Sequence, residues 1–345
     1  MPQQDDDDTD EARHPRETGV LFGHAGAEAA LLGAYRAGRM PHGILISGPK
    51  GIGKATLAYR FARFVLRYPD HSARDVQDAV SLEVDPADPV ARRITAQAQP
   101  DLLVIERTVN ERGVLRNQIA VDDIRRTVPF FGSTAGEGGW RIAIIDAVDD
   151  LNRSGANALL KVLEEPPKRG LLLLIAHSTA RVPPTLRSRC RIISLRPLVR
   201  EDVAAALAAA AGLESDDPEI AAAAAASDGS VARALTLVDE DALTLRQQAL
   251  DLLARLPAVD SADLHALGDA LAGTDPQALA AFLDTVNAWL SHRLDGGRGD
   301  LARLNRLAEA SEHINAAARD AETYNLERKP LVFNVFGLLA EATRG

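Results

Sequence analysis

A glycine-rich segment near the N-terminus has the residue types and spacing of a phosphate-binding loop. Gly48, Gly53 and Lys54 fit the pattern G-x-x-x-x-G-K, with Gly51 between the two outer glycines. Glycines at such positions allow backbone N–H groups to point inward onto phosphate oxygens. The lysine adds a positive charge for the terminal phosphates, and the start of the following helix also favours anions. The segment therefore predicts a nucleotide-phosphate site.

The residue after the lysine departs from this pattern. A Ser or Thr there would bind Mg²⁺ through its hydroxyl, but the sequence has Ala55. Thr56 follows one position later, which is about 100° further round a helix. We therefore expect Mg²⁺ to be held poorly, ATP or ADP to bind weakly at most, and no cofactor to be required.

A second motif is an apolar run that ends on an acid. Residues Ile142–Ile145 predict a buried parallel strand with Asp146 at its carboxyl end, where α/β sheets place ligand-handling groups. In a hydrolysing P-loop ATPase the next residue is a glutamate that polarises water, but here it is Ala147. Loss of a general base costs roughly 10²–10⁴ in rate. Asp149 and Asp150 follow on the next turn, where we expect them to cap a helix.

Strands and helices alternate around both motifs. The predicted strands alternate with helices across residues 18–197, which indicates a parallel sheet covered on both faces. After Pro197 only helical patterns remain, with a loop at Asp295–Asp300. The predicted strands are Gly43–Ser47, Leu102–Ile105, Ile142–Ile145, Leu171–Ala176 and Arg191–Leu195.

The division into domains follows from these patterns. We expect a disordered acidic tail over residues 1–17, an α/β domain over 18–198, a small helical domain over 199–240 and an all-α domain over 241–345. The net charge of the chain is −10, which argues against a general DNA-coating protein. No apolar stretch approaches the ~20 residues of a membrane span, so we expect no membrane contact. The single cysteine excludes an intrachain disulfide and fits a reducing cytoplasm.

Several longer motifs resemble a known family. The segments Gly43–Ala55 and Trp140–Pro167, together with Leu186-Arg187-Ser188-Arg189-Cys190, resemble the clamp-loader branch of the AAA+ proteins, as found in bacterial DNA polymerase III. Tyr324–Leu331 is similar too. The resemblance implies an AAA+ P-loop sheet domain, a helical lid domain and a helical collar that joins subunits.

The resemblance also assigns roles to single residues. The arginine of the family's Ser-Arg-Cys motif, here Arg189, is presented to ATP held by the neighbouring subunit. An always-charged planar guanidinium suits this task. The family's Gly-Ser-x-Arg pattern supplies a further arginine, but here Ala232 stands at that place and Arg233 is one position off. The polar sensor after the strand Leu171–Ala176 is either His177 or Ser178.

Another departure from the family concerns zinc. Many clamp-loader subunits carry four cysteines after the first helix, whereas residues Pro69–Pro100 contain none. We therefore predict no zinc and no other metal site.

Ala55, Ala147 and Ala232 thus mark three lost contacts while Arg189 remains. By resemblance, the chain is a non-hydrolysing, stator-like subunit of the DNA polymerase III holoenzyme, with no ATPase or polymerase activity of its own. Its implied partners are the clamp-loader ATPase (tau/gamma) subunits and the delta subunit in a pentamer, the sliding clamp and primed DNA. Two alternatives stay open: an active AAA+ ATPase that uses Asp149 or Asp150, and a non-enzymatic DNA-binding module.

Overall fold

The computed structural model describes residues 14–108, 116, 118–132, 139–211, 217–238, 240–272, 276–296, 301–324 and 326–344. Residues 1–13 of the predicted acidic tail and 297–300 of the predicted loop lie outside the described residues. Two compact units make up the chain: Met1–Ser215 with Asp228–Ala232, and Asp216–Ser227 with Arg233–Gly345. The domain boundaries at 198 and 240 remain predictions.

The N-terminal unit is built on a parallel sheet whose strands, within the described residues, have the order β2-β3-β4-β1-β5. This confirms the predicted α/β class. The strands match the predicted ones to within one residue at either end. They are β1 (Gly43–Ser47), β2 (Leu102–Glu106), β3 (Arg141–Asp146), β4 (Gly170–Ala176) and β5 (Arg191–Ser194).

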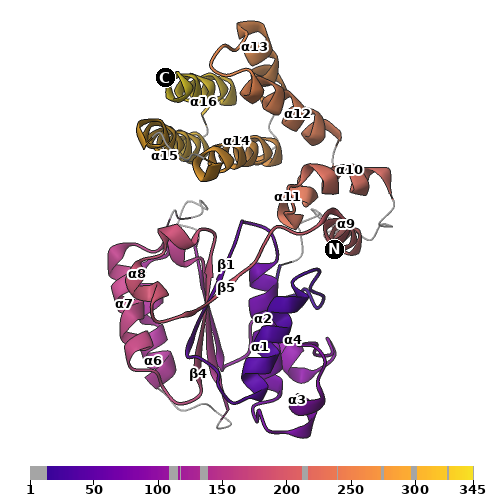
Figure 1. The fold of residues 1–345 in the computed structure, drawn as a ribbon, viewed down its shortest axis with the longest axis vertical. Coiled ribbons are helices and arrows are strands. Elements are labelled where there is room, and N and C mark those ends of the chain that lie inside the picture. Colours follow the sequence, from indigo (N-terminus) through magenta and orange to yellow (C-terminus); the bar gives the residue numbers. More distant parts are fainter. Residues whose placement is uncertain are drawn as a thin grey trace, which may run out of the picture. The chain divides into compact units, whose positions relative to one another are not determined.

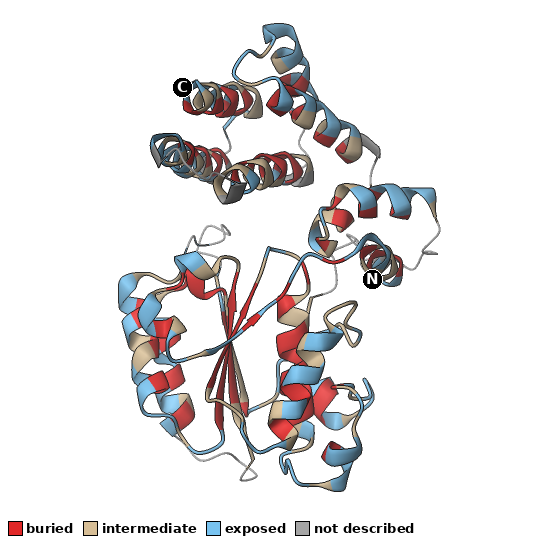
Figure 2. Cartoon of the chain, viewed as in Figure 1, coloured by how far each residue is buried: buried red, intermediate tan, exposed pale blue. Residues whose placement is uncertain are grey.

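The strands alternate their side chains between two cores, because successive residues of a strand point to opposite faces. On β1, Ile44 and Ile46 enter one cluster of buried side chains, and Leu45 enters the other. The same alternation separates Ile144 from Ile145 on β3. Both faces are therefore buried at the three inner strands β1, β3 and β4 (Figure 2). This is why these three strands contain continuous apolar runs, whereas only Ile193 is buried in the edge strand β5.

Helices cover both faces of this sheet (Figure 1). One set packs onto the face of Ile44 and contributes Tyr35, Phe61 and Phe64 to its core. The other set packs onto the face of Leu45, and Leu159 is among its buried residues. The first set is α1 (Ala25–Arg36), α2 (Lys54–Arg67), α3 (Arg74–Asp78) and α4 (Pro89–Thr95). The second set is α5 (Val121–Arg125), α6 (Thr127–Gly132), α7 (Arg153–Glu164) and α8 (Pro184–Arg187).

The helix after the acid-terminated strand begins differently from our expectation. Asn152 caps α7, because its side-chain oxygen accepts a hydrogen bond from the Gly155 N–H at 2.8 Å. Asp149 and Asp150 instead belong to a short 3₁₀ turn, η1 (Val148–Asp150), ahead of the helix. The prediction that these two acids cap the helix is therefore wrong.

The register of the sheet fixes which groups share an edge. Ser47 pairs with Ala176, and Asp146 pairs with Ile175 on the other side of β4. The carboxyl ends of β1, β3 and β4 therefore meet, and the glycine loop after β1 lies at the same edge as Asp146. At the opposite edge, Arg191 opens β5 beside Ile44, near the start of β1.

The C-terminal unit is helical in the residues described, which agrees with the predicted all-α class. Its main core gathers Leu253, Phe282, Ile314 and Val335, each from a different helix. None of the described helices combines the length and hydropathy that a bilayer span needs. After α9 (Arg200–Ala211) of the first unit, the helices are α10 (Pro218–Ala226), α11 (Val231–Leu235), α12 (Glu240–Ala254), α13 (Ser261–Ala270), α14 (Pro276–Gly296), α15 (Leu301–Tyr324) and α16 (Arg328–Thr343).

Candidate functional site

The predicted phosphate loop connects β1 to α2 and needs its glycines. Gly51 and Gly53 have φ values of +78° and +97°, a region that residues with a Cβ rarely adopt. Gly53 is also the residue from which α2 starts, so Lys54 opens the helix. Gly48, at the end of β1, completes the loop. The backbone thus has the strand–loop–helix form that the motif predicts.

The loop is covered by a distant segment of the same unit. The Ser230 hydroxyl donates to the Lys50 carbonyl at 3.0 Å, and the Ala232 N–H donates to the Gly51 carbonyl at 3.3 Å. A Cβ placed on Gly51 would lie 2.3 Å from Ser230 Oγ and 2.7 Å from Ala232 Cβ. The structure therefore places Ala232, where the family would supply an arginine, directly against the loop.

Lys54 is turned onto the loop itself. Its side chain is buried, and its Nζ donates to the Pro49 carbonyl at 2.5 Å. Burial lowers the pKa of Lys54 to about 8, against the opposing effect of the nearby carboxylates of Asp146 and Asp149. The ammonium already has an acceptor within its own chain.

The acid at the end of β3 lies close to this lysine. Burial raises the pKa of Asp146 to about 6, while the charge of Lys54 lowers it. The next side chain, Ala147, is 2% exposed and packs in the core. Ala55 and Thr56 are half-buried in the first turn of α2. The structure thus brings Lys54 and Asp146 together, with alanine at the positions expected to hold the metal and the water.

Asp149 has a structural task that the sequence did not reveal. Its buried carboxylate accepts hydrogen bonds from the backbone N–H groups of His177, at 3.1 Å, and Ser178, at 3.2 Å. It therefore ties η1 to the end of β4. Asp150 pairs with Arg107 at 3.3 Å. The carboxylates of Asp149 and Asp150 are both engaged by other groups of the chain, so neither is free to act as a general base that activates water. The geometry therefore does not favour the active-ATPase alternative.

The two sensor candidates both follow β4. Burial lowers the pKa of His177 to about 4, so its imidazole is neutral at pH 7. The backbone N–H groups of both His177 and Ser178 are engaged by Asp149. The choice between these two residues as the polar sensor stays open.

These residues fit Mg²⁺-ATP poorly. The lysine points to a carbonyl, the loop is covered by Ser230 and Ala232, and the metal-binding hydroxyl is replaced by Ala55. Among the described residues, no group of three or more His, Cys, Asp or Glu side chains could hold a metal ion. The absence of zinc remains a prediction.

Arg189 lies at the other edge of the sheet. The Arg189 carbonyl oxygen and Cys190 Sγ would be 3.5 Å and 3.0 Å from a Cβ placed on Gly43, the first residue of β1. The glycine loop begins five residues later, at the far end of β1. At about 3.3 Å per residue of a strand, this is a separation of roughly 16 Å. The structure therefore does not bring Arg189 to the chain's own phosphate loop.

Cys190 anchors this arginine. Its half-buried thiol packs against the core that contains Leu163, and burial raises its pKa to about 11. A thiol with such a pKa is almost fully protonated at pH 7 and is a poor nucleophile. Cys190 thus holds the segment in place, while the Arg189 side chain remains 39% exposed.

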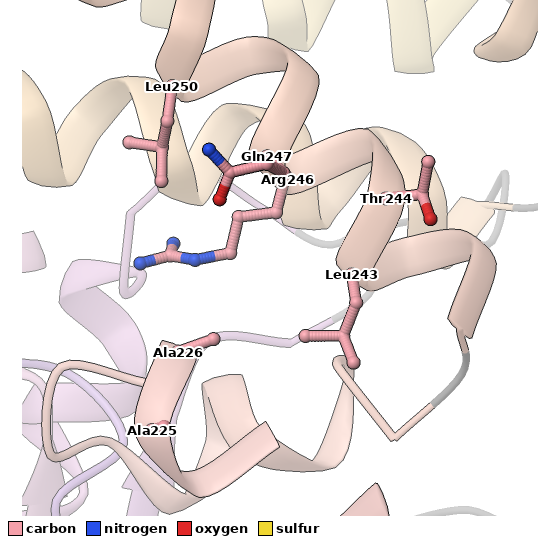
Figure 3. Close-up of a pocket in the computed structure, with 7 residues that line it drawn as sticks. All are labelled: Ala225, Ala226, Leu243, Thr244, Arg246, Gln247 and Leu250. Carbon is pink, nitrogen blue, oxygen red and sulfur yellow. The ribbon is translucent and has the colours of Figure 1, made fainter. Parts of the chain in front are cut away.

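A separate hollow of about 490 Å³ lies within the C-terminal unit between α10 and α12 (Figure 3). It is lined by Ala225, Ala226, Leu243, Thr244, Arg246, Gln247 and Leu250. The guanidinium of Arg246 is buried and donates to Thr285 Oγ1 at 3.3 Å. The lining contains no carboxylate, thiol or imidazole, so it offers no acid–base pair for catalysis.

We predict that Asp149→Ala lowers the free energy of unfolding by about 2 to 4 kcal/mol, because two backbone N–H groups lose their buried acceptor. Urea unfolding followed by circular dichroism measures the change. The control is Asp122→Ala, which removes an exposed acid paired with Arg125 on α5 and should change stability by less than about 0.5 kcal/mol. Equal losses for both variants would contradict the tie between η1 and β4.

We predict a pH-dependent effect for Asp146→Asn. The folded-state pKa is about 6 and the ordinary value is 3.8, so the folded chain binds more protons between these values. The free energy of unfolding contributed by Asp146 therefore falls as pH rises from about 4 to 6, by about 2 to 3 kcal/mol in all. The stability of the variant relative to wild type should grow over this range in urea titrations. A difference that stays constant with pH would contradict the burial of this acid.

Comparisons with known proteins agree with the motifs. Residues 23–199 match the family model described as DNA polymerase III, delta subunit. The chain is 34% identical over 149 residues to DNA polymerase III subunit delta' of Pseudomonas aeruginosa, a match that covers 43% of this chain and 41% of that protein. It is 29% identical over 241 residues to DNA polymerase III subunit delta' of Escherichia coli, which covers 70% and 67% of the two chains.

Among solved structures, a DNA polymerase III gamma subunit-related protein from Thermotoga maritima aligns with a TM-score of 0.41 at 15% identity. That alignment covers 91% of this chain and 99% of the other. The matched segment spans less than half of the Pseudomonas relative and about two thirds of the Escherichia coli one.

Proposed function

Because the chain belongs to the DNA polymerase III delta-subunit family, we propose that it is a non-hydrolysing clamp-loader subunit that supplies Arg189 to ATP bound by a neighbouring subunit. The loader would use this ATP to place a sliding clamp on primed DNA. The chain would thus contribute to hydrolysis without carrying out hydrolysis itself.

The position of Arg189 is the observation that carries this proposal. The arginine lies at the start of β1, whereas the chain's own glycine loop lies at the end of β1, roughly 16 Å away. An exposed guanidinium at that edge is available to a phosphate on another subunit, and it is badly placed for one in its own loop. Such an arginine supplied in trans is worth roughly 10³–10⁵ in rate.

The state of the chain's own nucleotide site supports the same proposal. Lys54 donates a hydrogen bond to the Pro49 carbonyl, and the carbonyls of Lys50 and Gly51 accept hydrogen bonds from Ser230 and Ala232. The Asp149 carboxylate accepts hydrogen bonds from the two backbone N–H groups that follow β4. The lysine that would meet the terminal phosphates is thus engaged by a carbonyl of the loop, and the segment that contains Ser230 and Ala232 packs directly against the loop. Ala55 replaces the hydroxyl that would bind Mg²⁺, and Ala147 replaces the general base. Each replacement by itself disfavours ATP hydrolysis at this site.

The partners in this proposal follow from the family. They are the ATPase (tau/gamma) subunits and the delta subunit, in a pentamer joined through helical collars such as α14–α16. In this complex the chain works in the cytoplasm as part of the DNA polymerase III holoenzyme, and it needs neither a cofactor nor zinc.

Reconstitution tests the proposal. The ATPase subunits should hydrolyse ATP faster in the presence of clamp and primed DNA when this chain is added, although the chain alone shows no turnover. An ordinary rate of hydrolysis by the purified chain, dependent on Mg²⁺, would overturn the proposal.

A further inference from the structure

We infer that Glu164 is a positioning residue for Arg189, whose guanidinium it holds at the surface in the place from which the arginine reaches a neighbour's phosphate. This inference rests on the proposed function of Arg189. It adds a second residue of this chain to the machinery of the neighbouring site, one that acts only through the arginine.

The contacts of the guanidinium carry the inference. Arg189 Nη2 lies 2.8 Å from Glu164 Oε1. On its other side, Nη1 donates to the Thr185 carbonyl at 3.1 Å and lies 3.4 Å from Ser188 Oγ. An arginine held by acceptors on two sides samples few of the rotamers that a free surface arginine samples.

The elements that present these acceptors are themselves fixed. Glu164 is the last residue of α7, directly after the core residues Val162 and Leu163. Thr185 belongs to α8, which is anchored in the same core by Leu186. Cys190 packs against this core too. The Glu164 carboxylate, the Thr185 carbonyl and the backbone of Arg189 are therefore all positioned by the same core.

The pair is nevertheless open to a partner. The Arg189 and Glu164 side chains are 39% and 50% exposed. A guanidinium has five N–H donors in a planar fork, which is more than the contacts with Glu164, Thr185 and Ser188 use. Exposed ion pairs are weak, and a phosphate can therefore engage the guanidinium without a large cost. Pre-orientation reduces the rotamer entropy that Arg189 loses on reaching the phosphate.

The neighbouring glutamate provides a matched control. Glu165 follows Glu164, is exposed, and makes no ion pair with any residue that the structure describes. The substitutions Glu164→Gln and Glu165→Gln remove the same charge at adjacent positions. Only the first removes the ion pair to the arginine.

The experiment uses the full chain in a loader reconstituted with its ATPase partners, clamp and primed DNA. We expect Glu164→Gln to lower kcat for ATP hydrolysis about 2- to 5-fold with little change in KM, the size that an exposed ion pair supports. Glu165→Gln should leave both values at the wild-type level. In an Arg189→Ala background, Glu164→Gln should have no further effect. Size-exclusion chromatography and thermal melts check assembly and folding.

Three results would overturn the inference. They are equal effects of the two glutamate variants, a further loss from Glu164→Gln when Arg189 is already alanine, and a rate increase on removal of the carboxylate. A lack of any effect of Arg189→Ala alone would instead remove the proposed function. The two failures are therefore distinguishable.

Discussion

Replacement of Arg189 by alanine is expected to lower ATP hydrolysis at the neighbouring site of the assembled loader roughly 10³-fold or more. The guanidinium would stabilise the charge that develops on the transferred phosphoryl group, and alanine offers nothing in its place. In steady-state assays with clamp and primed DNA, the contribution of that one site should disappear from the total rate. Assembly should be unchanged, because the side chain is exposed and outside the core.

Arg191→Ala is the matched control for this prediction. Arg191 is exposed, carries the same charge and lies two residues further along, at the start of β5. Its removal should leave the rate unchanged if position rather than charge matters. Equal losses for Arg189→Ala and Arg191→Ala would indicate a general basic surface, and an unchanged rate for both would make Arg189 an ordinary surface residue.

The second large effect is expected for the purified chain alone. Its ATP turnover should be at least about 10²-fold slower than that of an ATPase partner under the same conditions, because Ala147 supplies no general base. Loss of the metal-binding hydroxyl at Ala55 acts in the same direction. Any residual phosphate release should not depend on Mg²⁺, and Lys54→Ala should not reduce it. A malachite-green phosphate assay measures this turnover.

Lys50→Ala serves as the control, since Lys50 is an exposed lysine of the same loop. Turnover that requires Mg²⁺, is lost in Lys54→Ala and persists in Lys50→Ala would show a working phosphate loop. In that case the active-ATPase alternative would hold in spite of the alanines at 55 and 147.

The architecture of the N-terminal unit was largely predictable from local sequence. Its inner strands contain continuous apolar runs such as Leu171–Ala176, which are typical of a parallel sheet buried on both faces. The glycine loop was predictable too, because the spacing of its glycines marks positions with the positive φ values that Gly51 and Gly53 have and that other residues rarely adopt.

The contacts of the candidate site join segments that are far apart in the chain, and no local pattern reveals such contacts. Asp149 was expected to cap the next helix, but it binds backbone N–H groups 28 and 29 residues later, because β3 lies beside β4. The cover over Gly51 comes from Ser230, 180 residues beyond its bonding partner Lys50. The distance between Arg189 and the loop likewise follows from the pairing of Arg191 with Ile44. Sequence motifs identified these residues, and only the fold shows which of them meet.

The measurement that tests the central claim most directly compares two loaders that differ in one residue of this chain. One loader carries Arg189→Ala and the other Lys54→Ala, and both are assayed for ATP hydrolysis stimulated by clamp and primed DNA. We predict that the Arg189 variant loses the activity of the neighbouring site, while the Lys54 variant keeps the wild-type rate. The opposite result, with activity lost in Lys54→Ala and retained in Arg189→Ala, would mean that this chain hydrolyses its own ATP and supplies nothing to its neighbour.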